Sequence, residues 1–104
     1  MRSAYIDIET RSILDVSLPG DFDDDEPNAC YVHRINVPKE HRKKGIGRKL
    51  FDMLLEDADR EGIVLLLQPN PYGEMGILDL IAWYKRLGFV IVNRHSLMMR
   101  REPR

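Results

Sequence analysis

The first 37 residues alternate apolar and polar side chains with a period of two, the pattern of strands with one buried face. We predict strands over residues 4–9, 14–18 and 29–37. In the first strand the apolar set is Ala4, Ile6 and Ile8, which we expect to be buried. In the third strand, one face is predicted to carry Tyr31, His33, Ile35 and Val37, and the other Val32, Arg34 and Asn36.

After residue 38 the pattern changes to the spacing of amphipathic helices, interrupted by one aliphatic run. Helices are predicted over residues 48–60 and 77–87, and Gly62 and Gly88 are placed to end them. Residues 63–67 are consecutive aliphatics, typical of a strand buried on both faces, and residues 89–92 and 96–100 read as short strands. Strand, helix and buried strand in this order indicate a parallel crossover. We therefore predict an α/β (α+β) fold with a mixed, mostly antiparallel twisted sheet of about six strands and two main helices.

The composition is that of an ordinary globular chain, and its charge and cysteine content limit the partners and the compartment that we expect. With 104 residues, 43% of them hydrophobic and 32% charged, we predict one domain over residues 1–104. A net charge of −1 gives no overall attraction to nucleic acid or membranes, and no apolar stretch is long enough to span a bilayer. The single cysteine, Cys30, excludes an internal disulfide and fits a reducing compartment, so we expect a cytoplasmic protein.

One segment, HRKKGIGRKL at residues 41–50, carries the clearest chemistry. Gly45 and Gly47 allow a tight turn whose backbone amides are not shielded by a Cβ atom. A helix is predicted to follow directly, so the positive end of its dipole adds to the basic side chains around the turn. Because exposed amides at a helix N-terminus bind phosphate groups, a pyrophosphate is the ligand that we expect.

The glycine pattern fits neither of the two common nucleotide-binding motifs. A P-loop needs Gly-Lys-Ser/Thr, whereas Gly47 is followed by Arg48 and Lys49. The dinucleotide motif G-x-G-x-x-G fails because Leu50 stands in place of its third glycine. Two alternatives stay open at this point: a basic turn that only caps a surface helix, and nucleic-acid binding, which the lack of interleaved aromatic residues disfavours.

Two segments together resemble the GCN5-related N-acetyltransferase (GNAT) family. The first is Ile35-Asn-Val-Pro38 followed by Arg42-Lys-Lys-Gly-Ile-Gly47, similar to the acetyl-CoA pattern R-x-x-G-x-G/A that follows a strand in this family. The second is residues 83–89, Trp-Tyr-Lys-Arg-Leu-Gly-Phe, which resembles a helix ending in Y-x-x-x-G-F. The resemblance covers residues 29–100 and implies the acyl-CoA N-acyltransferase fold.

The resemblance also implies acetyl-CoA as co-substrate, no metal, and roles for individual residues. The pantetheine arm would lie where the third strand splays from its parallel neighbour, bonded to backbone amides of Ile35 and Val37. Tyr84 would protonate the leaving thiolate as general acid, since the reference pKa values of a phenol and a thiol lie within about two units. The residues implied in cofactor binding are Ile35, Asn36, Val37, Arg42, Lys43, Lys44, Gly45, Ile46, Gly47 and Arg48.

The candidate base departs from the family pattern. Tyr31 occupies the strand position where many members carry a glutamate as general base. His33, two residues later, is our candidate to accept a proton from the amine, with a purely structural role as the alternative. Glu26 and Glu74 are looser candidates. Asn70 precedes Tyr84 by too many residues to be assigned the cofactor contact that some members make with an asparagine.

The leading prediction is an N-acetyltransferase that moves an acetyl group from acetyl-CoA to a primary amine. Few residues precede the third strand, so the resemblance implies that the helices covering the acceptor site are missing. An open site suits a large acceptor, and the expected partner is a protein lysine or another cationic amine, attracted by the acidic block at residues 21–26. The alternative is a catalytically weak acetyl-CoA-binding module that regulates a protein partner. For both functions we expect neither nucleic acid nor a membrane as partner, and a homodimer is left open.

Overall fold

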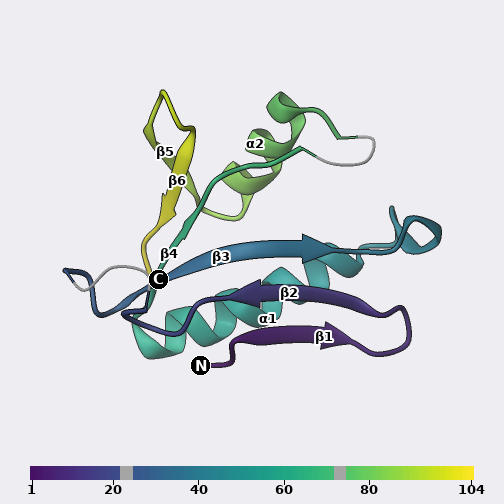
Figure 1. The fold of residues 1–104 in the computed structure, drawn as a ribbon, viewed down its shortest axis with the longest axis horizontal. Helices are drawn as coiled ribbons and strands as arrows, with labels where there is room; N and C mark the ends of the chain where they lie inside the picture. Colours follow the sequence, from purple (N-terminus) through teal and green to yellow (C-terminus); the bar gives the residue numbers. More distant parts are fainter. Residues whose placement is uncertain (22–24, 72–74) are drawn as a thin grey trace.

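The structure, a computed structural model, describes residues 1–21, 25–71 and 75–104, and in these ranges it forms one six-stranded sheet with two α-helices (Figure 1). The helices are α1 (Ile46–Glu61) and α2 (Ile77–Arg86), and a short 3₁₀ helix, η1 (Lys39–His41), precedes α1. The strands are β1 (Ala4–Asp7), β2 (Ser12–Val16), β3 (Ala29–Asn36), β4 (Val64–Leu67), β5 (Val90–Asn93) and β6 (Met98–Arg101).

The sheet is mixed, in the order β1-β2-β3-β4-β6-β5. Among the described strands, β3 and β4 make the parallel pair, and α1 connects them, while the other neighbours pair antiparallel. A parallel pair needs such a crossover, because the chain has to return to the same end of the sheet. The predicted fold class is confirmed.

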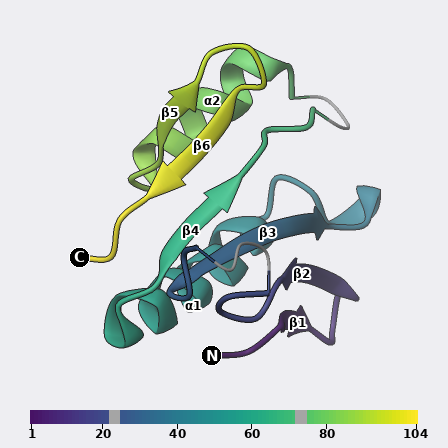
Figure 2. The same cartoon turned by 60° about the vertical axis from the view of Figure 1, so that its left-hand side comes forward.

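Both helices pack against the same face of the sheet (Figure 2). The core between the helices and the sheet contains fully buried side chains from both, such as Leu14 of β2, Phe51 and Leu54 of α1, and Met99 of β6. The opposite face carries a much smaller apolar cluster, centred on Ala29, Val64 and Leu66. We call this second face the helix-free face, since no helix of the described residues covers it.

The prediction that Ala4, Ile6 and Ile8 form the buried face of the first strand is wrong. Ile6 is 54% exposed and Ile8 is 85% exposed, whereas Tyr5 is fully buried. Tyr5 pairs with the buried Leu14 across the β1–β2 ladder, so the tyrosine shares the face that packs on α1. The apolar side chains of β1 therefore point to the helix-free face, because a strand's own period does not decide which face a neighbouring helix covers.

The predicted alternation of β3 is interrupted at His33. Asp15 pairs with Arg34, but the next residue, Val16, pairs with Val32, so His33 has no partner in the ladder and forms a β-bulge. The bulge turns Val32 and Ile35 to the same face, the face of the core, although alternation had separated them. A bulge beside a candidate site is a common device for re-aiming side chains.

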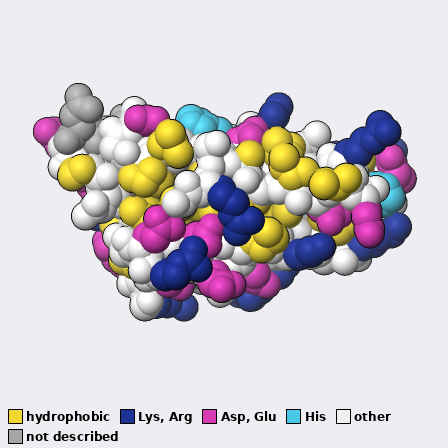
Figure 3. Space-filling model, turned by 90° about the horizontal axis from the view of Figure 1, so that it is seen from below, with side chains coloured by type: hydrophobic (Ala, Val, Ile, Leu, Met, Phe, Trp, Pro, Cys, Tyr) yellow, Lys and Arg dark blue, Asp and Glu magenta, His cyan; other side chains and the backbone are white. Residues whose placement is uncertain are grey.

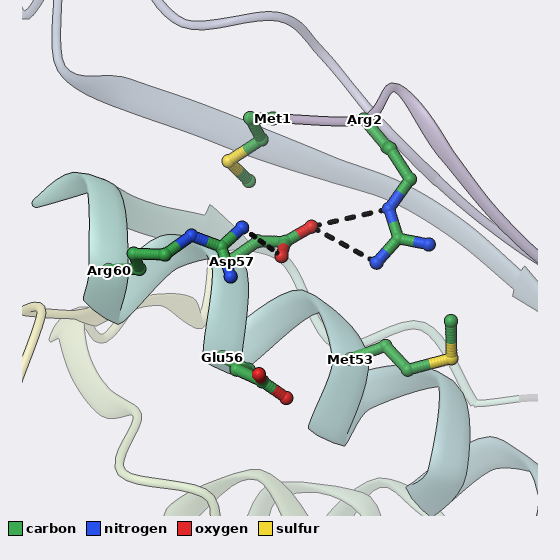
Figure 4. Close-up of a pocket in the computed structure, with 6 residues that line it drawn as sticks. All are labelled: Met1, Arg2, Met53, Glu56, Asp57 and Arg60. Atoms are coloured by element: carbon green, nitrogen blue, oxygen red, sulfur yellow. Dashed lines mark hydrogen bonds and ion pairs between the residues drawn. The ribbon is translucent and has the colours of Figure 1, made fainter.

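A buried carboxylate ties the first strand to α1. Asp57 accepts a hydrogen bond from the Tyr5 hydroxyl at 2.7 Å, and from Arg2 and Arg60 at 3.3 and 2.6 Å. Figure 4 shows the two guanidinium groups reaching Asp57 from opposite sides, beside a cavity of about 390 Å³. The Tyr5 hydrogen bond, ahead of those from Arg60 and Arg2, keeps the pKa of Asp57 below its ordinary value, and burial raises the pKa of Tyr5.

The surface of the molecule shows no region of a single charge on the side where β1 lies in Figure 1. Acidic and basic side chains lie close together there, and hydrophobic side chains appear in small groups (Figure 3). This mixture agrees with a net charge of −1.

Within the described ranges, no helix is both long and apolar enough to cross a membrane.

Candidate active site

The candidate site begins where β3 and β4 separate. Their ladder contains three residue pairs and ends at Tyr31 and Leu66, although β3 continues to Asn36. Beyond the last pair the strands diverge, as Figure 1 shows for the two arrows. On the side of β4, the backbone of β3 between Val32 and Asn36 therefore has no partner strand, while β2 still pairs with its other side.

A cavity of about 270 Å³, here the splay cavity, occupies this gap. Residues of β3, β4 and α2 line it. The side chains of Leu80 and Tyr84 reach it from α2, and Leu67 reaches it from β4. Its remaining lining residues are Val32, His33, Arg34, Ile35, Asn36, Gln68 and Asn70.

A second cavity of about 270 Å³, here the glycine-loop cavity, adjoins the first. Ile35, Leu80 and Tyr84 line both cavities, so these three residues form a wall that the two cavities share. The other residues that line the glycine-loop cavity are Val37, His41, Arg42, Lys43, Gly45, Ile46, Gly47, Arg48, Met75 and Trp83.

The glycine loop leaves backbone amides available at the start of α1. Gly45 is the N-cap residue, with a φ of 78°, and no side chain caps the helix there. The first turn of α1 holds no acidic residue, so its N–H groups and the positive end of its dipole face the cavity wall without a neutralising carboxylate. This arrangement fits the diphosphate of coenzyme A.

Glycine occupies positions 45 and 47 for different structural reasons. Gly45 needs its positive φ, which side chains rarely adopt, and Lys43 shares this backbone region with a φ of 65°. Gly47 lies inside the helix, and a Cβ atom there would come 3.3 Å from Cδ1 of Ile35. The sequence pattern indicated two glycines in the turn, but the left-handed positions are Lys43 and Gly45, and Gly47 is small because β3 lies close.

The basic side chains of the loop differ in their contacts. Arg42 donates from Nε to the carbonyl oxygen of Val37 at 2.9 Å, which fastens the loop to the end of β3. Arg48 bonds Asp52 at 2.8 Å, and Lys49 bonds Asp7 of β1 at 3.1 Å. Three of the predicted basic residues, Arg42, Lys43 and Arg48, line the cavity, whereas Lys44 is exposed and lines neither cavity.

Tyr84 is held by aromatic side chains on three sides. Its ring lies edge-on to Phe51, Trp83 and Phe89, with centroid distances of 5.6, 5.3 and 5.8 Å. Phe51 comes from α1 and also contacts Trp83, so both helices fix the ring. The residue is 6% exposed and lines both cavities. Tyr84 is therefore a phenol in the wall that the two cavities share, and a phenol is a group that can donate a proton.

His33 enters the splay cavity from the β3 bulge. Its ring lies edge-on to Tyr31, with a centroid distance of 5.3 Å, and the residue is exposed. Asn36 and Asn70 line the same cavity and not the glycine-loop cavity. His33 of β3 and Tyr84 of α2 therefore both line the splay cavity.

Other candidates from the sequence are not brought to the site. Glu26 bonds Arg100 of β6 at 2.9 Å and lines neither cavity, while Glu74, Asp23 and Asp24 lie outside the described residues. Cys30 is fully buried, and burial raises its pKa to about 11, so the thiol is not a nucleophile. In the described ranges no group of three or more His, Cys, Asp or Glu is placed to hold a metal ion.

Sequence reasoning missed four residues that line the glycine-loop cavity: His41, Met75, Leu80 and Trp83. The spacing of Leu80 and Tyr84, four apart on one helix, puts both on the same face, and this signal was available. The participation of His41 and Met75 depends on how η1 and the segment before α2 return to the cavity. No periodicity in the chain encodes those paths.

Comparison with known proteins agrees with the geometry. The sequence profile of the Acetyltransferase (GNAT) domain matches residues 14–91, and no curated protein matches the chain. The anti-CRISPR protein AcrVA5 is similar in structure, with 22% identity and a TM-score of 0.66 over 86% of this chain and 87% of that one. The GNAT family N-acetyltransferase YhbS from Escherichia coli, in complex with CoA, gives 17% identity and a TM-score of 0.61 over 93% of this chain and 55% of that one. The ribosomal-protein-S18-alanine N-acetyltransferase from E. coli gives 19% identity and a TM-score of 0.61, covering 88% and 59%.

The family match includes β3, the glycine loop and α2, the elements that form the two cavities. The chain therefore belongs to the GNAT family of N-acetyltransferases. The predicted family and the predicted enzyme class, an acetyl-CoA-dependent N-acetyltransferase, are confirmed, as is acetyl-CoA as co-substrate. The chain spans little more than half of either E. coli enzyme, and at these identities the solved structures share the fold alone.

Proposed function

We propose that this chain transfers the acetyl group of acetyl-CoA to a primary amine at the wall that the two cavities share. The observation that carries the proposal is the position of Tyr84, which lines both the glycine-loop cavity and the splay cavity. A donor bound in the first cavity and an acceptor in the second would meet at this residue.

The glycine loop is proposed to hold the diphosphate. The amides of the first turn of α1 would bind its oxygens, and the side chains of Lys43 and Arg48 would add positive charge. The splayed backbone of β3, at Ile35, Asn36 and Val37, would bind the pantetheine arm. Arg42 would act on the loop itself, because its guanidinium is bonded to the carbonyl of Val37.

The thioester of acetyl-CoA supplies an activated acetyl group. The acceptor nitrogen forms a bond to the acetyl carbon, and the bond from that carbon to sulfur breaks. Tyr84 donates a proton to the departing thiolate, and the amine loses one proton, which His33 accepts directly or through a water. One proton is thus given and one is taken on opposite sides of the acetyl carbon.

A protein amine, such as a lysine, is the proposed acceptor. His33 of the cavity lining is exposed and contacts Tyr31 of the apolar cluster on the helix-free face, so a large acceptor can approach from the face that no described helix covers. One structural neighbour is by name an acetyltransferase of a ribosomal protein. The organisation as one domain over residues 1–104 and the cytoplasmic location stay predictions, and a homodimer stays open.

A regulatory acetyl-CoA-binding module is the second candidate. The observation that favours it is the lining of the splay cavity, which contains no carboxylate from the described residues that could act as the usual base. The two candidates differ in turnover: the enzyme releases coenzyme A continuously when an amine is present, and the module does not.

The test is the variant Tyr84→Phe, measured by coenzyme A release with a lysine peptide and by calorimetry with acetyl-CoA. We expect turnover to fall by about 10²-fold, the usual scale for a lost proton donor, with the affinity for acetyl-CoA preserved because the ring and its aromatic contacts remain. Full activity in this variant would exclude Tyr84 as the acid. His33→Ala is the matching test of the base, and an unchanged pH–rate profile would exclude His33.

A further inference from the structure

The described lining of the splay cavity contains basic side chains but no carboxylate. Two lining residues can carry positive charge, His33 and Arg34, and none of the described lining residues is an aspartate or a glutamate. An acceptor amine that reaches Tyr84 from this side has to pass these residues.

Arg34 keeps much of its charge accessible at the mouth. Its Nε and Nη2 both bond one oxygen of Asp15, at 3.2 and 2.9 Å, yet the arginine side chain is 63% exposed and that of Asp15 only 29%. A guanidinium has five N–H donors in a fork that suits carboxylates, so donors of Arg34 remain for a second acid.

The turn between β5 and β6 carries a further cation and is bonded to a lining residue of the cavity. Gln68, which lines the cavity, donates from Nε2 to the carbonyl oxygen of Ser96 at 2.7 Å and so holds the turn beside it. The turn carries Arg94 and His95, both exposed. Arg94 forms no ion pair with any residue in the described ranges.

Asp15 is the acidic partner of Arg34 at the mouth, whereas two further acidic residues of this face lie at the other end of β3. Glu26 and Glu102 both bond Arg100, and the segment that holds Glu26 packs beside Ala29, where β3 begins. The cavity lies at the far end of the strand, past Val32. The described part of the acidic block thus does not border the acceptor side, in contrast to the expectation that it would attract basic acceptors.

We infer that the acceptor is a protein amine flanked by acidic residues, which dock on Arg34 at the mouth of the splay cavity and on Arg94 of the neighbouring turn. This inference rests on the proposed function and names the chemistry of its acceptor. Complementary charge speeds encounter and excludes partners of like charge, so a lysine among other basic residues is a poor substrate. Positive surroundings also favour the neutral form of an amine, which is the form that attacks.

The experiment compares three peptides of equal length, blocked at the N-terminus, with one central lysine flanked by glutamates, alanines or arginines. Initial rates at about 0.02 M and about 0.5 M salt give kcat/KM, since the Debye length shortens several-fold between them. At low salt we expect the glutamate peptide to exceed the arginine peptide by about tenfold or more, and the ratio to shrink at high salt.

Two charge-reversal variants locate the effect. Arg94→Glu is expected to lower kcat/KM for the glutamate peptide about fivefold or more, by the scale of electrostatic steering, and to leave the KM for acetyl-CoA unchanged. Arg86→Glu is the matched control: Arg86 is exposed at the end of α2, lines neither cavity and gives the same change in net charge. It is expected to have the kinetics of the unmodified protein.

Equal use of the three peptides, a preference for the arginine peptide, or equal effects of the two variants would each overturn the inference. Acetylation of a small amine such as ethylamine without acetylation of any peptide would also overturn it, while the proposed function stands. If neither small amines nor peptides are acetylated, the proposed function fails, and the inference fails with it.

Discussion

Replacing each glycine of the loop by alanine separates backbone strain from ligand contact. At Gly45 no heavy atom lies within 4 Å of the added Cβ, but φ is 78°. The left-handed region costs an L-residue roughly 1–2 kcal/mol, and the stiffer unfolded chain offsets about 0.4–1 kcal/mol of this. We therefore expect Gly45→Ala to lose about 1 kcal/mol of stability, or about 4–8 °C in Tm for a chain of this size.

Gly47→Ala is expected to behave in the opposite way. The new Cβ lies 3.3 Å from Cδ1 of Ile35, a flexible side chain that can yield, and alanine is the better helix former. Stability should change by no more than about 0.5 kcal/mol. The added methyl stands in the cavity wall between Gly47 and Ile35, so the affinity for coenzyme A should fall about tenfold, about 1.4 kcal/mol.

Differential scanning fluorimetry and calorimetric titration with coenzyme A measure both quantities. Gly76→Ala is the control, because Gly76 has a φ of −74°, open space around its Cβ position and no part in either cavity. If Gly47→Ala binds coenzyme A as tightly as the unmodified protein, the diphosphate does not lie at the loop. If Gly45→Ala keeps its Tm, the left-handed backbone is not required there.

Three further perturbations test the network around the core and the cavity wall. Asp57→Asn should lower stability at neutral pH and reduce the loss of stability in acid. The pKa of Asp57 is lowered in the fold, chiefly by the Tyr5 hydrogen bond, so the stability that the carboxylate contributes is full above about pH 3.9 and is lost as the pH falls through the folded pKa. Urea titrations at several pH values measure this dependence. Arg101→Met should cost about 2–4 kcal/mol in urea unfolding, because Arg101 is 3% exposed and its loss leaves Asp59 without its paired charge. Coenzyme A should change the fluorescence of Trp83, the single tryptophan, which lines the glycine-loop cavity; an unchanged spectrum at saturation would contradict that placement.

The order and type of the elements could be read from the sequence because each has a strong local period. The helix predicted at residues 48–60 is Ile46–Glu61, and the aliphatic run at 63–67 contains the buried β4. The predictions are wrong where the structure of a strand depends on the helix or strand that packs against it. The buried face of β1 is set by α1, and the break in β3 is set by its pairing with β2, which leaves His33 in a bulge. Neither relation is written in the period of a single strand.

The candidate site shows the same division. Gly45, Gly47 and Tyr84 were indicated by motifs whose chemistry is local: a turn with free amides and a phenol on a helix. The left-handed Lys43 was not indicated, because lysine has no preference for that region and the turn imposes it. The acidic block was expected to border the acceptor side, but its described residues line neither cavity. The turn that Gln68 holds beside the splay cavity was not expected, since a contact across 28 residues leaves no local pattern.

The short ladder between β3 and β4 has a consequence for local unfolding. It divides the sheet into two hydrogen-bonded units, β1–β3 with α1 and β4–β6 with α2, which share three residue pairs and one core. Units joined so briefly can open separately, and amide exchange then reports two opening free energies. The glycine loop belongs to the first unit and Tyr84 to the second, so a ligand that contacts both makes the two open as one. Occupancy of the site is therefore readable as cooperativity of hydrogen exchange across the whole sheet.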